Sequence, residues 1–189
     1  MAKESSSAII FLDVDGVLHP LGPNFLPLYA NLDDLVARTE LEIEYGDDPS
    51  YVPPMVEGEF LPECMNILRD IIERTGASIV LSSTWRESPC QRRIVASQFQ
   101  AHGISQHRLI SFTPISPSSS TRTRSREIKE WIQVHGFHGP YVVIDDYDLT
   151  QEEDGFSISH DHMVTCDGKI GLQLADADRA TGILKGKID

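Results

Sequence analysis

The chain has 189 residues, 40% of them hydrophobic, which fits a single globular domain over 1–189 with room for a substantial core. Its formal net charge of −13 disfavours extended binding to nucleic acid, because a polyanion is repelled at long range. The apolar run at 8–12 is too short for a secretory signal or a membrane span, and the three cysteines lie far apart. These features predict a cytoplasmic monomer with reduced thiols and no membrane association.

Short apolar runs alternate with amphipathic segments along the chain. Continuous apolar runs are typical of strands that lie inside a parallel sheet and are covered on both faces, whereas apolar residues at three- and four-residue spacing indicate helices. We therefore expect strands at 8–12, 78–81, 108–112 and 141–144 and helices at 64–76, 92–102 and 128–136. This alternation predicts an α/β fold with a central, mainly parallel sheet.

Two segments interrupt the alternation. Residues 19–60 contain many prolines and acidic side chains, and they separate the first strand from the first clear helix. We interpret this segment as a small insertion in the domain, either a lid or an acidic flap on the surface. Residues 113–125 have the proline, serine and threonine content that is typical of a loop or linker.

Polar side chains follow three of the expected strands. In chain order they are Asp13 and Asp15, then Ser82 and Ser83, then Asp145 and Asp146. Because ligands of open parallel sheets bind beyond the carboxyl ends of the strands, we expect these groups to meet there. Carboxylates gathered at one sheet edge repel one another, and a divalent cation with oxygen ligands relieves that repulsion. Mg²⁺ is the expected ion because it commonly accompanies phosphate groups.

The spacing of the first two carboxylates is also informative. In an extended chain, the side chains of Asp13 and Asp15 point to the same side, so both can face one substrate. Gly16 then allows the chain to turn sharply.

The strand-end motifs resemble those of the haloacid dehalogenase (HAD) superfamily. Phe11-Leu-Asp-Val-Asp-Gly-Val-Leu18 is similar to the first motif, Val80-Leu-Ser-Ser83 to the second, and Val142-Val-Ile-Asp-Asp146 to the fourth. The string Leu-Ser-Ser-x-Trp-Arg and the later Arg-x-x-Glu-Ile-x-x-Trp-Ile pattern are similar to small HAD domains that include phosphatase modules of RNA-repair proteins. The resemblance implies a three-layer α/β/α Rossmann-like HAD fold with a small insertion after the first strand.

The chemistry and the resemblance together suggest a role for each carboxylate. Asp13 would attack phosphorus and form an aspartyl-phosphate, while Asp15 would protonate the leaving oxygen and later activate water. Mg²⁺ would be held by Asp13, the backbone carbonyl of Asp15 and Asp145. Asp146 is a further metal candidate, and the alternative for it is a supporting carboxylate beside the metal ligands.

The second motif offers candidates for binding phosphate. Ser82 would hydrogen-bond a phosphoryl oxygen, although capping of the following helix is an alternative. Ser83 is included among the phosphate-binding candidates, and a structural role fits it as well. Trp85 and Arg86 would either line the substrate side or pack in the core with a surface ion pair.

The third motif supplies a cation, for which Arg124, Arg126 and Lys129 are candidates. At about 100° per residue, Arg124 lies near the face of Ile128 at the amino end of its helix, whereas Arg126 faces solvent. Lys129 lies more than a turn further along the helix. We choose Arg124 first and Lys129 second, although most members of the superfamily have lysine at this position.

The expected activity is magnesium-dependent hydrolysis of a phosphomonoester. A phosphotransferase shares the same intermediate, and a catalytically silent interaction domain or a receiver-like domain are alternatives of other classes. The retained carboxylates favour an enzyme, because a silent domain has no need to keep them together. Since the insertion at 19–60 is too small for a full cap, the expected substrates include small molecules, nucleic-acid ends and phosphoproteins.

Overall fold

The computed structural model describes residues 8–115, 123–151 and 155–187, and within them the strands form one sheet. All neighbouring strands are parallel, and their order is β3-β2-β1-β4-β5. The strands are β1 (Ile9–Leu12), β2 (Ser78–Leu81), β3 (Leu109–Phe112), β4 (Tyr141–Asp145) and β5 (Met163–Thr165). The α-helices are α1 (Leu32–Tyr45), α2 (Pro62–Thr75), α3 (Pro89–Ala101), α4 (Arg124–Val134) and α5 (Leu174–Leu184). The predicted parallel α/β sheet is therefore confirmed.

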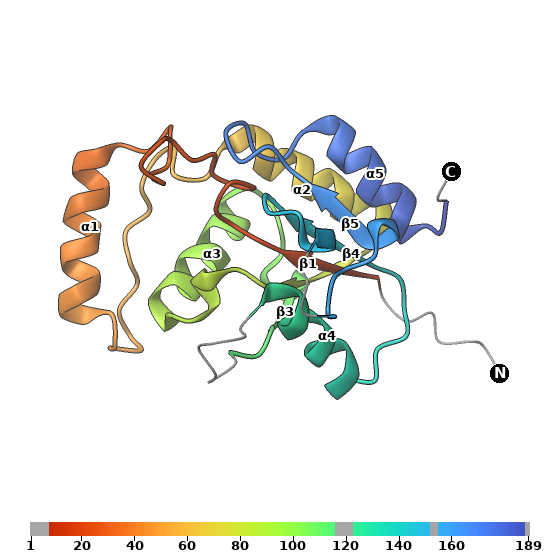
Figure 1. Cartoon of the computed structure of the whole chain (residues 1–189). Helices are drawn as coiled ribbons and strands as arrows, with labels where there is room; N and C mark the ends of the chain where they lie inside the picture. The colour runs from red at the N-terminus through yellow and green to blue at the C-terminus, as the bar shows by residue number, and fades with distance from the viewer. Residues whose placement is uncertain (1–7, 116–122, 152–154, 188–189) are drawn as a thin grey trace.

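The sheet lies between two helical layers, with α2 and α5 on one face and α4 on the other (Figure 1). Successive side chains of β1 alternate between these faces. Ile10 and Leu12 belong to the core shared with α2, α3 and α5, whereas Ile9 and Phe11 pack with α4. Burial on both faces explains why the strands are continuous apolar runs, and it confirms the expected three-layer architecture.

The helices begin and end where their local sequence allows. Pro62 occupies the first turn of α2, where its missing N–H is not needed, and Gly76 ends the helix in the left-handed region at φ 71°. The Gly76 N–H donates to the Ile72 carbonyl at 2.8 Å, which satisfies one of the last carbonyls of the helix. On the opposite face of the sheet, α4 buries Ile128 and Trp131 against β1.

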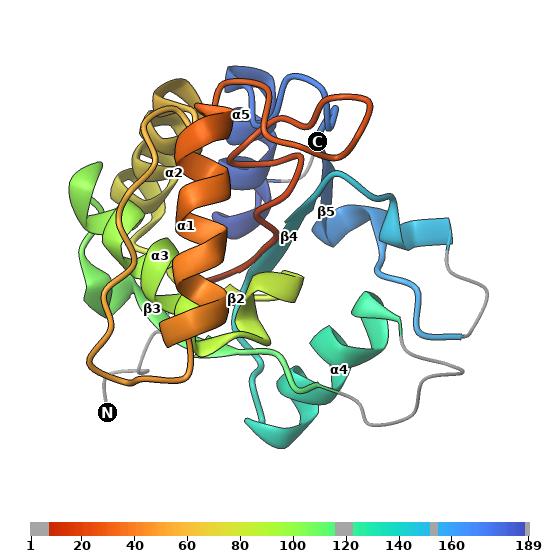
Figure 2. The same ribbon diagram turned by 90° about the vertical axis from the view of Figure 1, so that its left-hand side faces the viewer.

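The segment between β1 and α2 contains α1, a helix that stands apart from the sheet (Figures 1 and 2). This helix was not predicted from the sequence, because its apolar residues do not form a buried stripe. Val36 and Ile43 are 59% and 82% exposed. The side chain that α1 does bury is Arg38, which forms an ion pair with buried Glu59 near the end of the insertion.

The last strand and helix were also not predicted. β5 is only three residues long, and α5 buries the small residues Ala177, Ala180 and Thr181, with the large apolar residues Ile183 and Leu184 only at its end. The described residues include no helix that is long and apolar enough to cross a membrane. Cys64, Cys90 and Cys166 are all buried and form no disulfide.

Candidate active site

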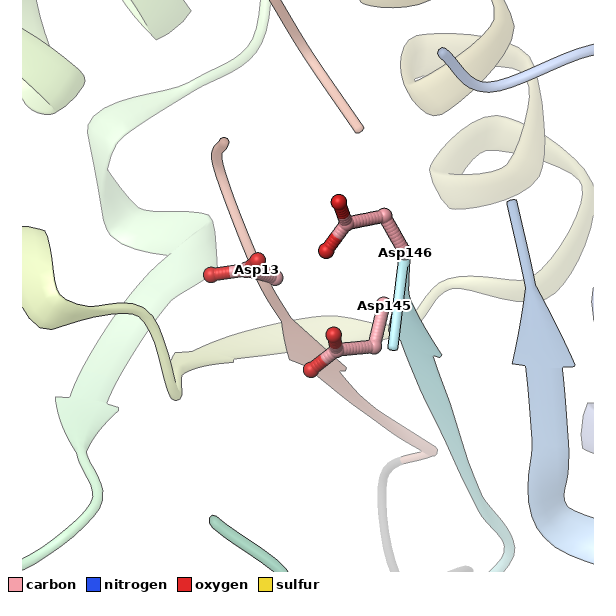
Figure 3. A group of neighbouring side chains, drawn as sticks. All are labelled: Asp13, Asp145 and Asp146. Atoms are coloured by element: carbon pink, nitrogen blue, oxygen red, sulfur yellow. The ribbon is translucent and has the colours of Figure 1, made fainter. Parts of the chain in front are cut away.

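Three carboxylates meet at the carboxyl edge of the sheet (Figure 3). Asp13 follows β1, Asp145 ends β4, and Asp146 comes directly after it. Because β1 and β4 are neighbours in the sheet, their ends bring the three side chains together, and one oxygen of each lies within 4.8 Å of the others. Asp13 and Asp145 are buried, whereas Asp146 is partly exposed.

Two glycines make room for Asp146. Gly16 has φ 71°, and a Cβ atom at this position would lie 2.3 Å from Asp146 Oδ2. At Gly168, in the loop after β5, a Cβ atom would lie 2.7 Å from the same oxygen. Both distances are far below normal contact, so the Asp146 carboxylate can occupy its position only because these residues have no side chain.

Arg124 supplies a positive charge to this cluster from the first residue of α4. Its Nη1 lies 2.9 Å from Asp13 Oδ2 and 2.5 Å from Asp145 Oδ2. Burial disfavours the charged form of Arg124, but Asp13 and Asp145 outweigh that effect and raise its pKa above the ordinary value. Arg124 is therefore a permanent cation that bridges the ends of β1 and β4.

One arginine does not fully offset three carboxylates. Burial raises the pKa of Asp13 above its ordinary value, and the charge of Asp15 adds to the effect while Arg124 opposes it. Burial and the charge of Asp13 likewise raise the pKa of Asp145 and of Asp146. The folded protein thus holds its carboxylates at an electrostatic disadvantage that further positive charge would relieve.

The donor set fits a hard divalent cation. Asp13 Oδ1 is buried and has no hydrogen-bond partner among the described residues, which leaves its lone pairs available to a ligand. Carboxylate oxygens are the ligands that Mg²⁺ prefers, and such an ion would supply the missing positive charge. Asp13, Asp145 and Asp146 are the residues that could hold it.

Asp15 lies in a different environment from the three clustered carboxylates. Its Oδ1 contacts His19 Nε2, and the Trp85 indole N–H donates to both carboxylate oxygens at 3.1 and 3.2 Å. Burial alone would raise the pKa of Asp15, but hydrogen bonds from His19 and Trp85 and the charge of Arg124 hold it below its ordinary value. The side chain of Asp15 keeps 36% of its exposure, so it faces the solvent side of the site.

The two serines after β2 differ in what they contact. The backbone N–H of Ser82 donates to the Leu12 carbonyl at 2.9 Å, so this residue lies beside the end of β1. Its hydroxyl is buried without a hydrogen-bond partner among the described residues, as expected of a donor that awaits a ligand. The Ser83 hydroxyl accepts a hydrogen bond from the Trp85 backbone N–H at 3.4 Å, which is the geometry of a helix cap. It also lies close enough to Asp13 to lower the pKa of that carboxyl.

Arg86 organises the loop behind these serines. It is 3% exposed, and its guanidinium donates to the carbonyls of Ser82, Ser83 and Thr113 at 3.0, 2.7 and 3.1 Å. The same group forms a buried ion pair with Glu127 of α4. The sequence left Arg86 between substrate contact and a surface ion pair, and the structure shows a buried ion pair instead. The Arg86 and Glu127 charges therefore have a structural role that their spacing in the sequence alone could not reveal.

The other two cations of α4 lie away from the carboxylates. The Lys129 ammonium lies 5.9 Å from the centroid of the Phe156 ring, and the Arg126 guanidinium lies 5.0 Å from it. Lys129 was the second choice for the phosphate-binding cation, but its side chain points to this separate surface. The geometry therefore favours Arg124 for that role.

The sequence matches the family described as the HAD domain in Swiss Army Knife RNA repair proteins over residues 9–177. The chain belongs to this family. A search of curated proteins finds no match. In this HAD domain, the acidic cluster at the ends of β1 and β4 occupies the part of the fold where the first and fourth HAD motifs meet.

Several contacts of this HAD domain were not predicted from the sequence. His19 was placed only within the insertion, and nothing in its spacing indicated that it meets Asp15. Gly168 carried no signal, because an isolated glycine in a loop is common. The Trp85-Arg86 pair was recognised as part of a motif, and its partners became visible only in the folded chain.

Proposed function

We propose that this HAD domain is a magnesium-dependent phosphomonoesterase that acts through an aspartyl-phosphate on Asp13. The observation that carries the proposal is the position of Asp13 itself. One of its carboxylate oxygens pairs with Arg124, while the other is buried and unpaired within the described residues, in a cluster suited to a divalent cation. Because HAD domains are usually phosphohydrolases, this geometry supports phosphoryl transfer.

In the proposed first step, an Asp13 carboxylate oxygen attacks phosphorus, and the bond between phosphorus and the leaving oxygen breaks. Arg124 would contact phosphoryl oxygens while keeping Asp13 oriented, and the unpaired Ser82 hydroxyl would donate to another phosphoryl oxygen. A bound Mg²⁺ would offset the negative charges of the phosphoryl group and the carboxylates. Ser83 caps the following helical turn and lies beside Asp13, so it would help to position that carboxylate.

Asp15 would transfer the proton in both steps. As an acid it gives its proton to the leaving oxygen, and as a base it then takes a proton from the water that attacks the aspartyl-phosphate. The site without substrate favours ionised Asp15, but an anionic phosphoryl group beside it would raise its proton affinity. Its partial exposure supports contact with the leaving group on the solvent side.

The family description points to one class of substrate. Because the matching family is named for RNA repair, a terminal phosphate on RNA is the substrate to test first. A net charge of −13 disfavours long contacts with a nucleic-acid backbone, but it does not prevent capture of a single terminal group. Phosphorylated metabolites and phosphopeptides are the other substrate classes to test. Transfer of the phosphoryl group to an alcohol, instead of to water, would identify a phosphotransferase.

The test compares the wild type with Asp13→Asn and the control Asp178→Asn, which removes an exposed carboxylate that pairs with Arg74. Phosphate release from 4-nitrophenyl phosphate, RNA with 3′- or 5′-phosphate ends and phosphopeptides is measured with Mg²⁺ or with excess chelator. We expect Asp13→Asn to lower turnover by several orders of magnitude, chelator to abolish it, and Asp178→Asn to leave it unchanged. Asp13→Asn activity equal to the wild type, or full activity in chelator, would overturn the mechanism.

A further inference from the structure

The carboxylate of Asp15 accepts hydrogen bonds from two side chains that come from different parts of the chain. His19, at the start of the insertion, contacts Oδ1 through Nε2. Trp85, in the short helical turn after β2, donates its indole N–H to Oδ1 and Oδ2 at 3.1 and 3.2 Å. Oδ1 therefore has two donors and Oδ2 has one, which leaves Oδ2 as the freer oxygen for a substrate.

A third ring holds the two donors in place. Phe60, near the end of the insertion, has its ring centroid 5.4 Å from that of His19 and 5.5 Å from that of Trp85. The rings of His19 and Trp85 are 5.3 Å apart, so each ring of the group touches the other two. All three residues are buried, at 2%, 2% and 7% exposure for His19, Phe60 and Trp85. Such packing restricts the side-chain rotamers of both donors.

The insertion brings its first and last residues to the same place. The Leu61 N–H donates to the Leu18 carbonyl at 2.9 Å, which joins the two ends of the segment beside Asp15. Glu59, next to Phe60, is anchored by its ion pair with Arg38 of α1. The position of Phe60, and through it that of His19, therefore depends on the folding of the insertion.

We infer that His19 and Phe60 from the two ends of the insertion, together with Trp85, form an aromatic clamp that positions Asp15 for proton transfer. The inference rests on the proposed phosphatase activity. It gives the two ends of the insertion a role in positioning Asp15. When the phosphorus–oxygen bond to the leaving group breaks and Asp13 forms the new bond, Asp15 must present its proton to the leaving oxygen. A partly exposed carboxylate without such contacts could adopt several side-chain rotamers. Hydrogen bonds to both oxygens of Asp15 restrict it to one rotamer.

The contact between His19 and Asp15 leaves the other ring nitrogen of His19 without a hydrogen bond among the described residues. This atom, Nδ1, is buried, so the ring satisfies only the nitrogen that faces Asp15. A ring that merely filled the core would be served equally well by an apolar side chain without that orphaned atom. The orientation of His19 is thus better explained by the carboxylate than by packing.

The clamp predicts losses that depend on the leaving group. Trp85→Phe keeps the ring and removes the N–H, and its matched control is Trp131→Phe, which removes an indole N–H donated to Ser111 Oγ at 2.9 Å. A nitrophenolate leaving group needs little protonation, whereas an alkoxide needs it strongly. We expect Trp85→Phe to lower kcat about 10–100-fold on an alkyl phosphate, which is part of the roughly 10²–10⁴-fold that general acid catalysis contributes. The loss on 4-nitrophenyl phosphate is expected to be several-fold smaller, with KM nearly unchanged on both.

Three further variants separate positioning from folding. His19→Gln retains a donor at a similar reach and should recover most of the alkyl-phosphate activity that His19→Leu loses. Phe60→Leu should reproduce the selective loss of Trp85→Phe to a smaller degree, because it loosens the rings without removing a donor. Circular dichroism and thermal melting identify any variant that fails to fold, and the comparison between the two substrates is made only on folded protein.

The outcomes distinguish failure of the clamp from failure of the proposed function. If the wild type hydrolyses both substrates but Trp85→Phe loses activity equally on each, or loses no more than Trp131→Phe does, Trp85 does not position Asp15. The same conclusion follows if His19→Gln is no better than His19→Leu. If the wild type hydrolyses neither substrate, the proposed phosphatase activity fails first.

Discussion

Arg124 provides the positive charge that partly offsets the carboxylates of the site. It contacts both Asp13 and Asp145, and its side chain keeps 22% of its exposure, so a phosphoryl group can reach it from solvent. Arginine and lysine bind phosphate differently, because the guanidinium offers a planar fork of donors and the ammonium acts as a point charge. In the proposed mechanism, Arg124 would therefore pair with Asp13 and still offer donors to the phosphoryl group.

Replacement of Arg124 tests this role at the residue scale. Arg124→Ala removes a preorganised donor to the phosphoryl group, and we expect kcat/KM to fall by about 10²–10³-fold. Arg124→Lys should restore part of that loss, since it returns the charge without the fork. Steady-state kinetics on 4-nitrophenyl phosphate measures both.

Arg126→Ala and Lys129→Ala are the controls for that measurement. Both remove a cation from the same helix, but their charged groups lie over Phe156 and not at the carboxylates. Each should change kcat/KM by less than about threefold. A larger loss in either than in Arg124→Ala would show that the phosphate-binding cation is a different residue.

At the scale of elements, the buried pair of Arg86 and Glu127 joins α4 to the loop after β2. Arg86 fixes the carbonyls of Ser82 and Ser83, and Glu127 lies one helical turn beyond Arg124. The same contact therefore aligns a serine of the second motif with the arginine of the third. This alignment gives a physical reason for the Trp-Arg and Arg-x-x-Glu strings in the sequence.

Removal of the Glu127 charge should destabilise the fold. In Glu127→Gln, Arg86 keeps its bonds to backbone carbonyls but loses the buried carboxylate that balances its charge. Breaking a buried pair on one side lowers the free energy of unfolding by about 3–5 kcal/mol. Urea denaturation followed by circular dichroism measures the change.

The matched control is Glu130→Gln, because Glu130 lies on the same helix and is exposed. Its effect should stay within about 0.5 kcal/mol, as for most surface substitutions. Equal effects of the two substitutions would mean that the Arg86–Glu127 pair adds nothing to the stability of the loop.

At the scale of the whole molecule, the carboxylate cluster would couple stability to binding of the proposed Mg²⁺. Ionised Asp146 is disfavoured in the fold, because burial and the charge of Asp13 raise its pKa. A carboxyl group with a raised pKa in the folded state weakens folding once the pH exceeds its ordinary value, since the unfolded chain then releases the proton more easily. At neutral pH without metal, the cluster therefore lowers the stability of the protein.

Thermal melting with and without Mg²⁺ tests this coupling. An ion that binds only the folded state at 100 times its Kd adds about 2.7 kcal/mol of stability, which raises Tm by about 5–10 °C for a chain of this size. Asp146→Asn should raise Tm in chelator, because it removes a repelling charge, and should reduce the Mg²⁺-dependent rise. A lower Tm for Asp146→Asn in chelator, with an unchanged response to Mg²⁺, would exclude Asp146 from the metal site.

Much of the fold could be predicted because its signals are local. A strand buried on both faces must be apolar throughout, so β1, β2 and β4 were visible as runs of four or five residues. Parallel strands also end at one edge of the sheet, which allowed Asp13 and Asp145 to be placed together before any partner was known. Helix α1 escaped detection because its apolar side chains are exposed and it is anchored by a buried charge.

The α/β class, the strand ends that carry the carboxylates and the expected face of Arg124 on its helix could all be predicted from local patterns in the sequence. The contacts of Trp85 and His19 with Asp15, and of Arg86 with Glu127, became apparent only in the folded chain. Trp85 and Asp15 are 70 residues apart in the chain, and Arg86 and Glu127 are 41 apart. Periodicity records which face of an element is buried, but the partner across a contact depends on how all the elements pack.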